Sequence, residues 1–126
     1  MNDIETRHIL VADDQSHVRS ALRLLLEQEP NMVVVGEAVD VTGLFKRLER
    51  GPVDVLLLDW DLPGLPIRHV LRLLQLERPS LPIIAMSSRP EARQQALQAG
   101  VAAFLSKGAP PETVLSLLAQ LPQTTT

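Results

Sequence analysis

The sequence predicts an α/β domain built from five consecutive strand–helix units around a doubly wound parallel sheet. Three observations lead to this fold class. Short apolar segments alternate with amphipathic segments along the chain. The apolar segments are continuous rather than alternating, as in strands that are covered on both faces. Ten prolines and six glycines separate the segments, so the boundaries of the predicted elements can be read directly.

The first two units occupy the first 52 residues. The apolar run at 8–12 predicts a buried strand. A helix is expected over 16–29, with apolar residues at helical spacing: Val18, Leu22, Leu25 and Leu26. The valine-rich segment 32–37 predicts the second strand. A helix of about ten residues is expected next. Its N-cap would be Asp40 or Thr42, and Gly51-Pro52 would end it.

The third unit carries the strongest strand signal in the chain, the run VDVLLLD at 53–59. A loop rich in proline follows, and a helix is expected over 67–78. The fourth strand, 82–87, begins with a proline, which is tolerated at the first position of a strand. The fourth helix, 91–99, ends at the next glycine.

The fifth unit consists of a strand at 101–105 and a helix at 110–121, which opens on two prolines that suit a first helical turn. Because no repeat or linker interrupts the pattern, we expect one domain over 1–126, with a core at about 7–121 and a frayed tail at 122–126. Right-handed crossovers favour the sheet order 2-1-3-4-5, which is the flavodoxin-like three-layer sandwich.

Composition excludes several classes of function. The only aromatic residues are Phe45, Trp60 and Phe104, too few for a surface on which nucleic-acid bases stack. The net charge of −3 argues against direct contact with nucleic acid. The absence of cysteine excludes disulfides and thiolate chemistry. Without a long apolar run or a signal-peptide core, we expect a cytoplasmic protein with no membrane contact.

Four of the five predicted strands end in polar side chains suited to chemistry. In chain order these are Asp13 and Asp14, then Asp59 with Asp61 two residues later, then Ser87, and finally Lys107. The carboxyl ends of parallel strands lie at one edge of a sheet, and the order 2-1-3-4-5 makes these four strands neighbours. We therefore expect all six side chains around one crevice.

Each of these residues also has an ordinary explanation. Asp14 and Ser87 could cap the helices that follow them, and Lys107 could be a solvated loop lysine. Their occurrence together at one predicted edge favours a functional site. The choice of lysine also favours it, because Lys46 and Lys107 are the only lysines beside ten arginines.

Electrostatics indicates what such a site could do. Two carboxylates about 5 Å apart repel each other by roughly 3 kcal/mol at an effective dielectric constant near 20. Hard oxygen ligands without imidazole or thiolate suit Mg²⁺, which would relieve this repulsion. An ionised Asp59 would then be a nucleophile toward phosphorus, with Ser87 and Lys107 placed to bind phosphoryl oxygens.

Four motifs carry a family resemblance: the pair Asp13-Asp14, LLLDWDLPG at 56–64, the strand that ends at Ser87, and FLSK at 104–107. Together they resemble the receiver domain of two-component response regulators, over about residues 7–121. The segment LSKGAPPE at 105–112 is more similar to receivers of the LuxR/NarL-type group.

The resemblance implies a phosphorelay signalling domain rather than an enzyme. In such a domain Asp59 accepts a phosphoryl group from the phosphohistidine of a sensor histidine kinase or a phosphotransfer protein. The cofactor would be Mg²⁺, held by three carboxylates and one main-chain carbonyl: those of Asp13, Asp14 and Asp59, and the carbonyl of Asp61. Lys107 and Ser87 would bind the phosphoryl group, and Ser87 with Phe104 would form the switch that alters a surface for a partner or an output domain.

Two other functions remain open at this point. The interval from Ser87 to Lys107 is about two residues shorter than is usual in that family. This leaves open a binding module of the same fold that is not phosphorylated, although the presence of all the site residues argues against it. The motif from Asp59 to Asp61 also matches haloacid-dehalogenase-type phosphatases. That assignment lacks downstream aspartates, and the remaining acids fall inside or at the start of helices: Glu77, Glu91 and Glu112.

Leucines beyond the core stripes suggest a further surface. Leu115 lies off the apolar stripe of the last helix, and the first helix is also rich in leucine. Two interpretations stay open: a partner or homodimer surface that involves the fourth and fifth helices and the fifth strand, or leucines scattered over the surface without a partner.

Overall fold

The computed structural model describes residues 6–122 of the chain. It contains a five-stranded parallel sheet in the order β2-β1-β3-β4-β5, as predicted. The strands are β1 Arg7–Ala12, β2 Met32–Ala38, β3 Val55–Asp59, β4 Ile83–Ser87 and β5 Ala103–Ser106. The helices are α1 Ser16–Leu26, α2 Val41–Leu48, α3 Ile67–Glu77, α4 Ala92–Gln98 and α5 Thr113–Gln120.

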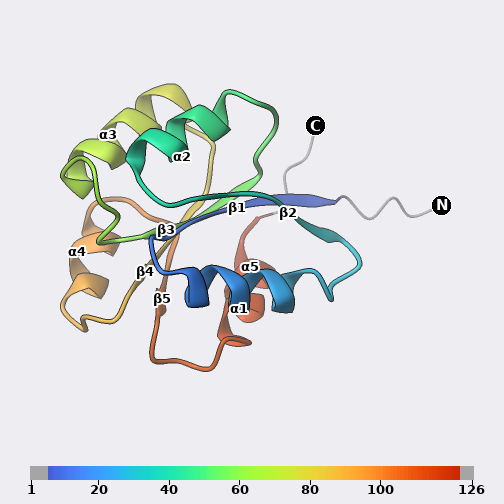
Figure 1. The fold of residues 1–126 in the computed structure, drawn as a ribbon. Helices are drawn as coiled ribbons and strands as arrows, with labels where there is room; N and C mark the ends of the chain where they lie inside the picture. The colour runs from blue at the N-terminus through green and yellow to red at the C-terminus, as the bar shows by residue number, and fades with distance from the viewer. Residues whose placement is uncertain (1–5, 123–126) are drawn as a thin grey trace.

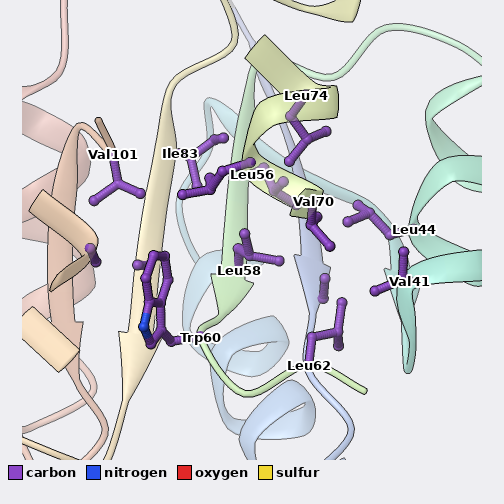
Figure 2. Close-up of a cluster of buried hydrophobic side chains, with 14 of the residues drawn as sticks. Val41, Leu44, Leu56, Leu58, Trp60, Leu62, Val70, Leu74, Ile83 and Val101 are labelled. Atoms are coloured by element: carbon purple, nitrogen blue, oxygen red, sulfur yellow. The ribbon is translucent and has the colours of Figure 1, made fainter. Parts of the chain in front are cut away.

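Helices cover both faces of the sheet, which gives the three predicted layers (Figure 1). Leucine and valine side chains of α1 and α5 pack on one face, and those of α2, α3 and α4 pack on the other. Each central strand is buried on both sides because its residues alternate between the two clusters. In Figure 2 Leu56 and Leu58 of β3 face the cluster under α2, α3 and α4. Trp60, which is 3 % exposed, lies in the same cluster.

All ten elements are present, but several ends differ from the predicted ones. The last helix begins at Thr113 rather than at residue 110, because the two prolines belong to a preceding turn whose carbonyls accept the N–H groups of Thr113 and Val114. The first helix ends at Leu26, since the following residues form turns before β2. The predicted tail at 122–126 lies outside the described residues except for its first position.

The leucine of α5 that we expected at the surface is partly buried. Leu115 packs against the cluster that α1 and α5 share, so the helical stripe is wider than predicted. The large apolar side chains that are most exposed lie elsewhere, at Leu24 on α1 and Leu76 on α3. Among the described residues no helix is long and apolar enough to cross a membrane.

The loop between β3 and α3 depends on a glycine. Gly64 has φ +133°, a conformation that residues with a side chain rarely adopt. A Cβ atom there would lie 2.8 Å from Cβ of Val41. The loop is held this close because the carbonyl of Pro63 accepts the Val41 N–H at 3.0 Å.

Replacing this glycine is therefore expected to destabilise the fold. Gly64→Ala should lower the free energy of unfolding by about 1–3 kcal/mol, through backbone strain and the contact with Val41. Gly108→Ala is the matched control, because its new Cβ would meet nothing closer than Ser106 Oγ at 3.7 Å. Urea unfolding of both variants measures the difference, and equal losses would contradict the expectation.

Candidate functional site

Three carboxylates converge at the carboxyl edge of the sheet. Asp13 and Asp14 follow β1 directly, and Asp59 ends β3, the strand beside it. Carboxylate oxygens of the three residues lie within 4.8 Å of one another. Asp13 and Asp59 are 0 % and 2 % exposed, whereas Asp14 is exposed to solvent. The cluster predicted from the strand order is therefore present.

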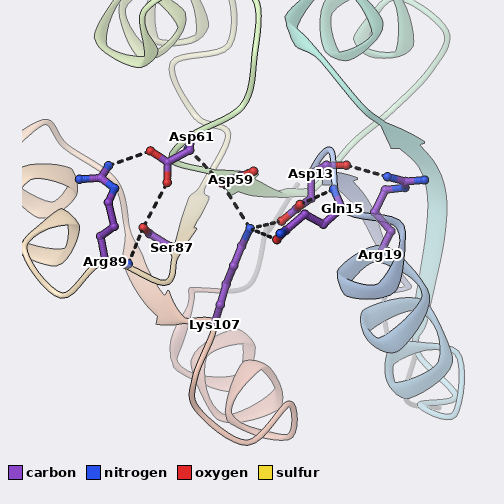
Figure 3. A network of polar contacts seen from close by, with 8 residues as sticks. All are labelled: Asp13, Gln15, Arg19, Asp59, Asp61, Ser87, Arg89 and Lys107. Carbon is purple, nitrogen blue, oxygen red and sulfur yellow. Dashed lines mark hydrogen bonds and ion pairs between the residues drawn. The ribbon is translucent and has the colours of Figure 1, made fainter.

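Lys107 closes the crevice from the side of β5 (Figure 3). Its Nζ atom lies 2.8 Å from Oδ2 of Asp13 and 3.4 Å from Oδ1 of Asp59. It also donates to Oε1 of Gln15 at 3.1 Å. The main chain of Lys107 is held beside the end of β4, because the Lys107 N–H donates to the carbonyl of Ser87 at 2.9 Å. Gln15 was not predicted, and its place directly after the acid pair is the only signal that could have indicated it.

The environment of Asp59 favours its neutral form. Burial raises the pKa of Asp59 above the ordinary value for an aspartate, and the nearby charge of Asp13 acts in the same direction. The N–H of Asp61, which donates to Oδ1 of Asp59 at 2.9 Å, lowers the pKa, as does Lys107. Added positive charge in the crevice would therefore help to keep this carboxylate ionised.

Ser87 and Asp61 face each other beside this cluster. Ser87 ends β4 and is 1 % exposed. Its Oγ donates to Oδ2 of Asp61 at 3.4 Å and accepts the Arg89 N–H at 3.0 Å. The guanidinium of Arg89 pairs with Oδ1 of Asp61 at 2.8 Å. The Asp61 side chain thus points toward Ser87 and Arg89 (Figure 3). Arg89 is a further residue that sequence reasoning missed.

The ordinary explanations for two of these residues do not hold. Gln15, not Asp14, occupies the N-cap of α1 and makes no side-chain capping bond. Glu91 occupies the N-cap of α4, four residues beyond Ser87. Phe104, the predicted switch residue, is 9 % exposed and packs in the cluster under α2, α3 and α4. It pairs with Ala85 in the sheet and is therefore a neighbour of the strand that carries Ser87.

The residues present fit a hard divalent cation. The donors are carboxylate oxygens with no imidazole or thiolate among them, the set that Mg²⁺ prefers. Oδ1 of Asp13 accepts the Gln15 N–H at 2.9 Å. Oδ2 of Asp13 is buried and accepts no hydrogen bond from the described residues, so only the ion pair with Lys107 balances its charge. A metal cation at this oxygen would take the place of the Lys107 ammonium.

Known proteins are similar to this chain in sequence. The sequence profile of the response regulator receiver domain matches residues 9–119. The response regulator UvrY of Escherichia coli K12 is 34 % identical over 113 residues, which cover 88 % of this chain and 52 % of UvrY. A protein-glutamate methylesterase/protein-glutamine glutaminase of Symbiobacterium thermophilum is 38 % identical over 104 residues, 79 % of this chain and 28 % of that protein.

The fold comparison agrees. The isolated REC domain of RcsB from Salmonella enterica serovar Typhimurium, solved in the presence of the phosphomimetic BeF3−, superposes with a TM-score of 0.83 at 27 % identity. The match covers 91 % of this chain and 87 % of that domain. The chain spans about half the length of UvrY.

Proposed function

The chain belongs to the family of response regulator receiver domains, and we propose that Asp59 is its phosphoacceptor. The observation that supports this most is the meeting of the buried Asp59 carboxylate with two further acids and one lysine at a single edge of the sheet. The domain is a signalling domain, and the phosphoryl transfer to its own side chain is the chemistry we assign to it.

In the proposed reaction a carboxylate oxygen of Asp59 attacks phosphorus. The new O–P bond forms while the N–P bond of a phosphohistidine breaks, and the imidazole leaves with the electron pair. Lys107, already 3.4 Å from Asp59, would pair with the phosphoryl oxygens. Ser87 would donate its hydroxyl proton to one of them. Phe104 lies on β5 beside the strand that carries Ser87. Its side chain would change position together with Ser87.

The metal site that we propose consists of the three clustered carboxylates and the main-chain carbonyl of Asp61. When bound, Mg²⁺ supplies positive charge against the developing charge of the phosphoryl oxygens. Asp13 would exchange its contact with Lys107 for the ion, and the ammonium would be released toward Asp59.

The phosphoryl donor would be a sensor histidine kinase or a phosphotransfer protein. We assign no nucleic-acid contact to this chain itself, whose net charge is −3. A solved structure of Salmonella RcsB is bound to promoter P1flhDC, and this chain covers 59 % of that protein. DNA binding in response to this signal would therefore belong to another domain or a partner.

The homodimer surface on α4, β5 and α5 stays a prediction. Leu97 on α4 is 39 % exposed at this surface.

No specific observation favours either alternative function. A module of the same fold that is not phosphorylated would not need two further acids and Lys107 gathered around the carboxylate of Asp59. A haloacid-dehalogenase-type phosphatase would need metal-binding acids downstream of Asp61. Within residues 6–122 the one cluster of three candidate metal ligands is instead that of Asp13, Asp14 and Asp59.

Phosphoryl uptake by the purified chain tests the proposal. Incubation with acetyl phosphate and Mg²⁺ is expected to add the mass of one phosphoryl group to the intact protein, and hydroxylamine should remove it, because the product is an acyl phosphate. Asp54→Asn, at the opposite end of β3, is the matched control and should be labelled like the wild type. If neither acetyl phosphate nor a phosphorylated histidine donor labels the wild-type chain, the proposed function is wrong.

Mg²⁺ is expected to stabilise the folded chain in the absence of any donor. A ligand that binds only the folded state stabilises it by about 2.7 kcal/mol at a hundred times its Kd, or several degrees in Tm for a domain of this size. Thermal melting with MgCl₂, against NaCl of equal ionic strength, measures the effect. Asp13→Asn should remove the shift, and an equal shift in both salts would contradict the metal site.

A further inference from the structure

Asp61, Ser87 and Arg89 form a closed ring of contacts on the side of the crevice away from Lys107 (Figure 3). Arg89 Nη2 lies 2.8 Å from Oδ1 of Asp61, and Oδ2 of Asp61 lies 3.4 Å from Ser87 Oγ. The main-chain N–H of Arg89 donates to the same Oγ at 3.0 Å and closes the ring. The Asp61–Ser87–Arg89 ring links the end of β3 to the loop that leads into α4.

The ring determines the direction in which the Ser87 hydroxyl points. A hydroxyl has one proton to donate, and here the acceptor is Asp61. A lone pair of the oxygen is already used by the Arg89 N–H. Because Ser87 is 1 % exposed, water has little access to offer a substitute. In this state the proton is not directed to Asp59.

Arg89 in turn holds the Asp61 carboxylate in place. Asp61 is half-exposed, with 51 % of its side chain accessible, so it would turn toward water without its cation. The second partner of Arg89 is Glu91, at the longer distance of 3.4 Å. The ion pair borders an open hollow of about 410 Å³ that is also lined by Trp60, Ile67 and Gln95. This hollow leaves room for the pair to separate.

We propose that Asp61 and Arg89 are positioning residues that hold the Ser87 hydroxyl in its unphosphorylated direction. The hydrogen bond between Ser87 and Asp61 must break before the hydroxyl can donate to a phosphoryl oxygen. The ring therefore opposes the phosphorylated state by the strength of these contacts. This inference rests on the proposed function of Asp59.

A double-mutant cycle separates this role from the charge of Asp61. The phosphorylated fraction at fixed acetyl phosphate and saturating Mg²⁺ is measured for Asp61→Asn in two backgrounds, wild type and Ser87→Ala. If Asp61→Asn acts only through charge on the anionic phosphoryl donor, its effect is the same in both backgrounds and cancels in the cycle. We expect the gain from Asp61→Asn to be about two- to five-fold larger with Ser87 present, as exposed ion pairs and long hydrogen bonds are weak.

The same cycle applies to Arg89. Arg89→Gln should resemble Asp61→Asn in its coupling to Ser87, and Arg89→Lys, which keeps the ion pair, should stay close to the wild type. Equal effects of Asp61→Asn in both Ser87 backgrounds would overturn the proposal, because Asp61 would then act through its charge alone.

A measurement without phosphorylation keeps this test independent of the proposed function. The Arg89 amide proton, which is bound to Ser87 Oγ, is expected to change its NMR chemical shift in unphosphorylated Asp61→Asn. Glu91→Gln, which removes only the weaker partner of Arg89, should leave that shift close to the wild-type value. If the wild type takes up no phosphoryl group, the proposed function fails, and an unchanged Arg89 amide in Asp61→Asn rejects the ring separately.

Discussion

Asp59→Asn is expected to abolish phosphoryl uptake completely, below the detection limit of intact mass measurement. A neutral amide is not a nucleophile toward phosphorus, and the two neighbouring carboxylates have different surroundings. Asp13 is buried against Lys107 and Asp14 is exposed. A variant that still gains the mass of one phosphoryl group at another residue would show that Asp59 is not the acceptor.

The same substitution is expected to make the fold more stable. Burial raises the pKa of Asp59, so the folded chain holds this proton more tightly than the unfolded chain does. The stability linked to that proton is fully present below the unfolded pKa and is lost as the pH rises through the folded pKa. The asparagine side chain of the variant would be neutral at every pH and would avoid the loss.

At neutral pH without Mg²⁺, we expect Asp59→Asn to raise the free energy of unfolding and therefore the Tm. The difference should shrink as the pH is lowered and the wild-type carboxyl becomes protonated. Melting curves across the acid range measure this trend. A variant that is less stable at neutral pH, or a difference that grows in acid, would contradict it.

The second large effect is expected at Lys107. Lys107→Met keeps the length of the side chain and removes its charge, which leaves Asp13 and Asp59 buried without a cation. Removing one partner of a buried ion pair typically costs about 3–5 kcal/mol. Lys46→Met is the matched control, because Lys46 is exposed on α2 and should change stability by less than about 0.5 kcal/mol. Urea unfolding without Mg²⁺ compares the two.

Mg²⁺ should restore much of the stability that Lys107→Met loses. In the wild type the ion must displace the ammonium from Oδ2 of Asp13, 2.8 Å away, whereas in the variant that oxygen is free. The stabilisation by a given Mg²⁺ concentration should thus be larger for Lys107→Met than for the wild type. An equal or smaller gain would show that Lys107 and the metal do not compete for Asp13.

The sheet and the acid cluster could be predicted because they depend on patterns along the chain. Continuous apolar strands require helices on both faces, and the strand order then brings Asp13, Asp59, Ser87 and Lys107 to one edge. Helix ends were less predictable because local contacts decide them. The prolines before α5 suit a first helical turn in isolation, yet here they form a separate turn.

The side-chain directions within the site could not be predicted. Asp61 follows Asp59 by two residues, but whether it faces the acids or Arg89 depends on how the β3–α3 and β4–α4 loops approach each other. Arg89 carries no pattern that distinguishes it from a solvated loop residue, and Gln15 carries only its place directly after the acid pair. Leu115 was placed outside the core by helical spacing alone, whereas the width of the contact between α1 and α5 decides its burial.

The reach of Lys107 to the β1–α1 loop has a consequence for folding. Lys107 and Gln15 are 92 residues apart in the chain, so their contact closes one of the longest loops in the domain. Such distant contacts cost a large chain entropy and form late on average. Until β5 docks, the acids lack their internal cation. We therefore expect refolding in Mg²⁺ to be accelerated most at the steps that precede the docking of β5.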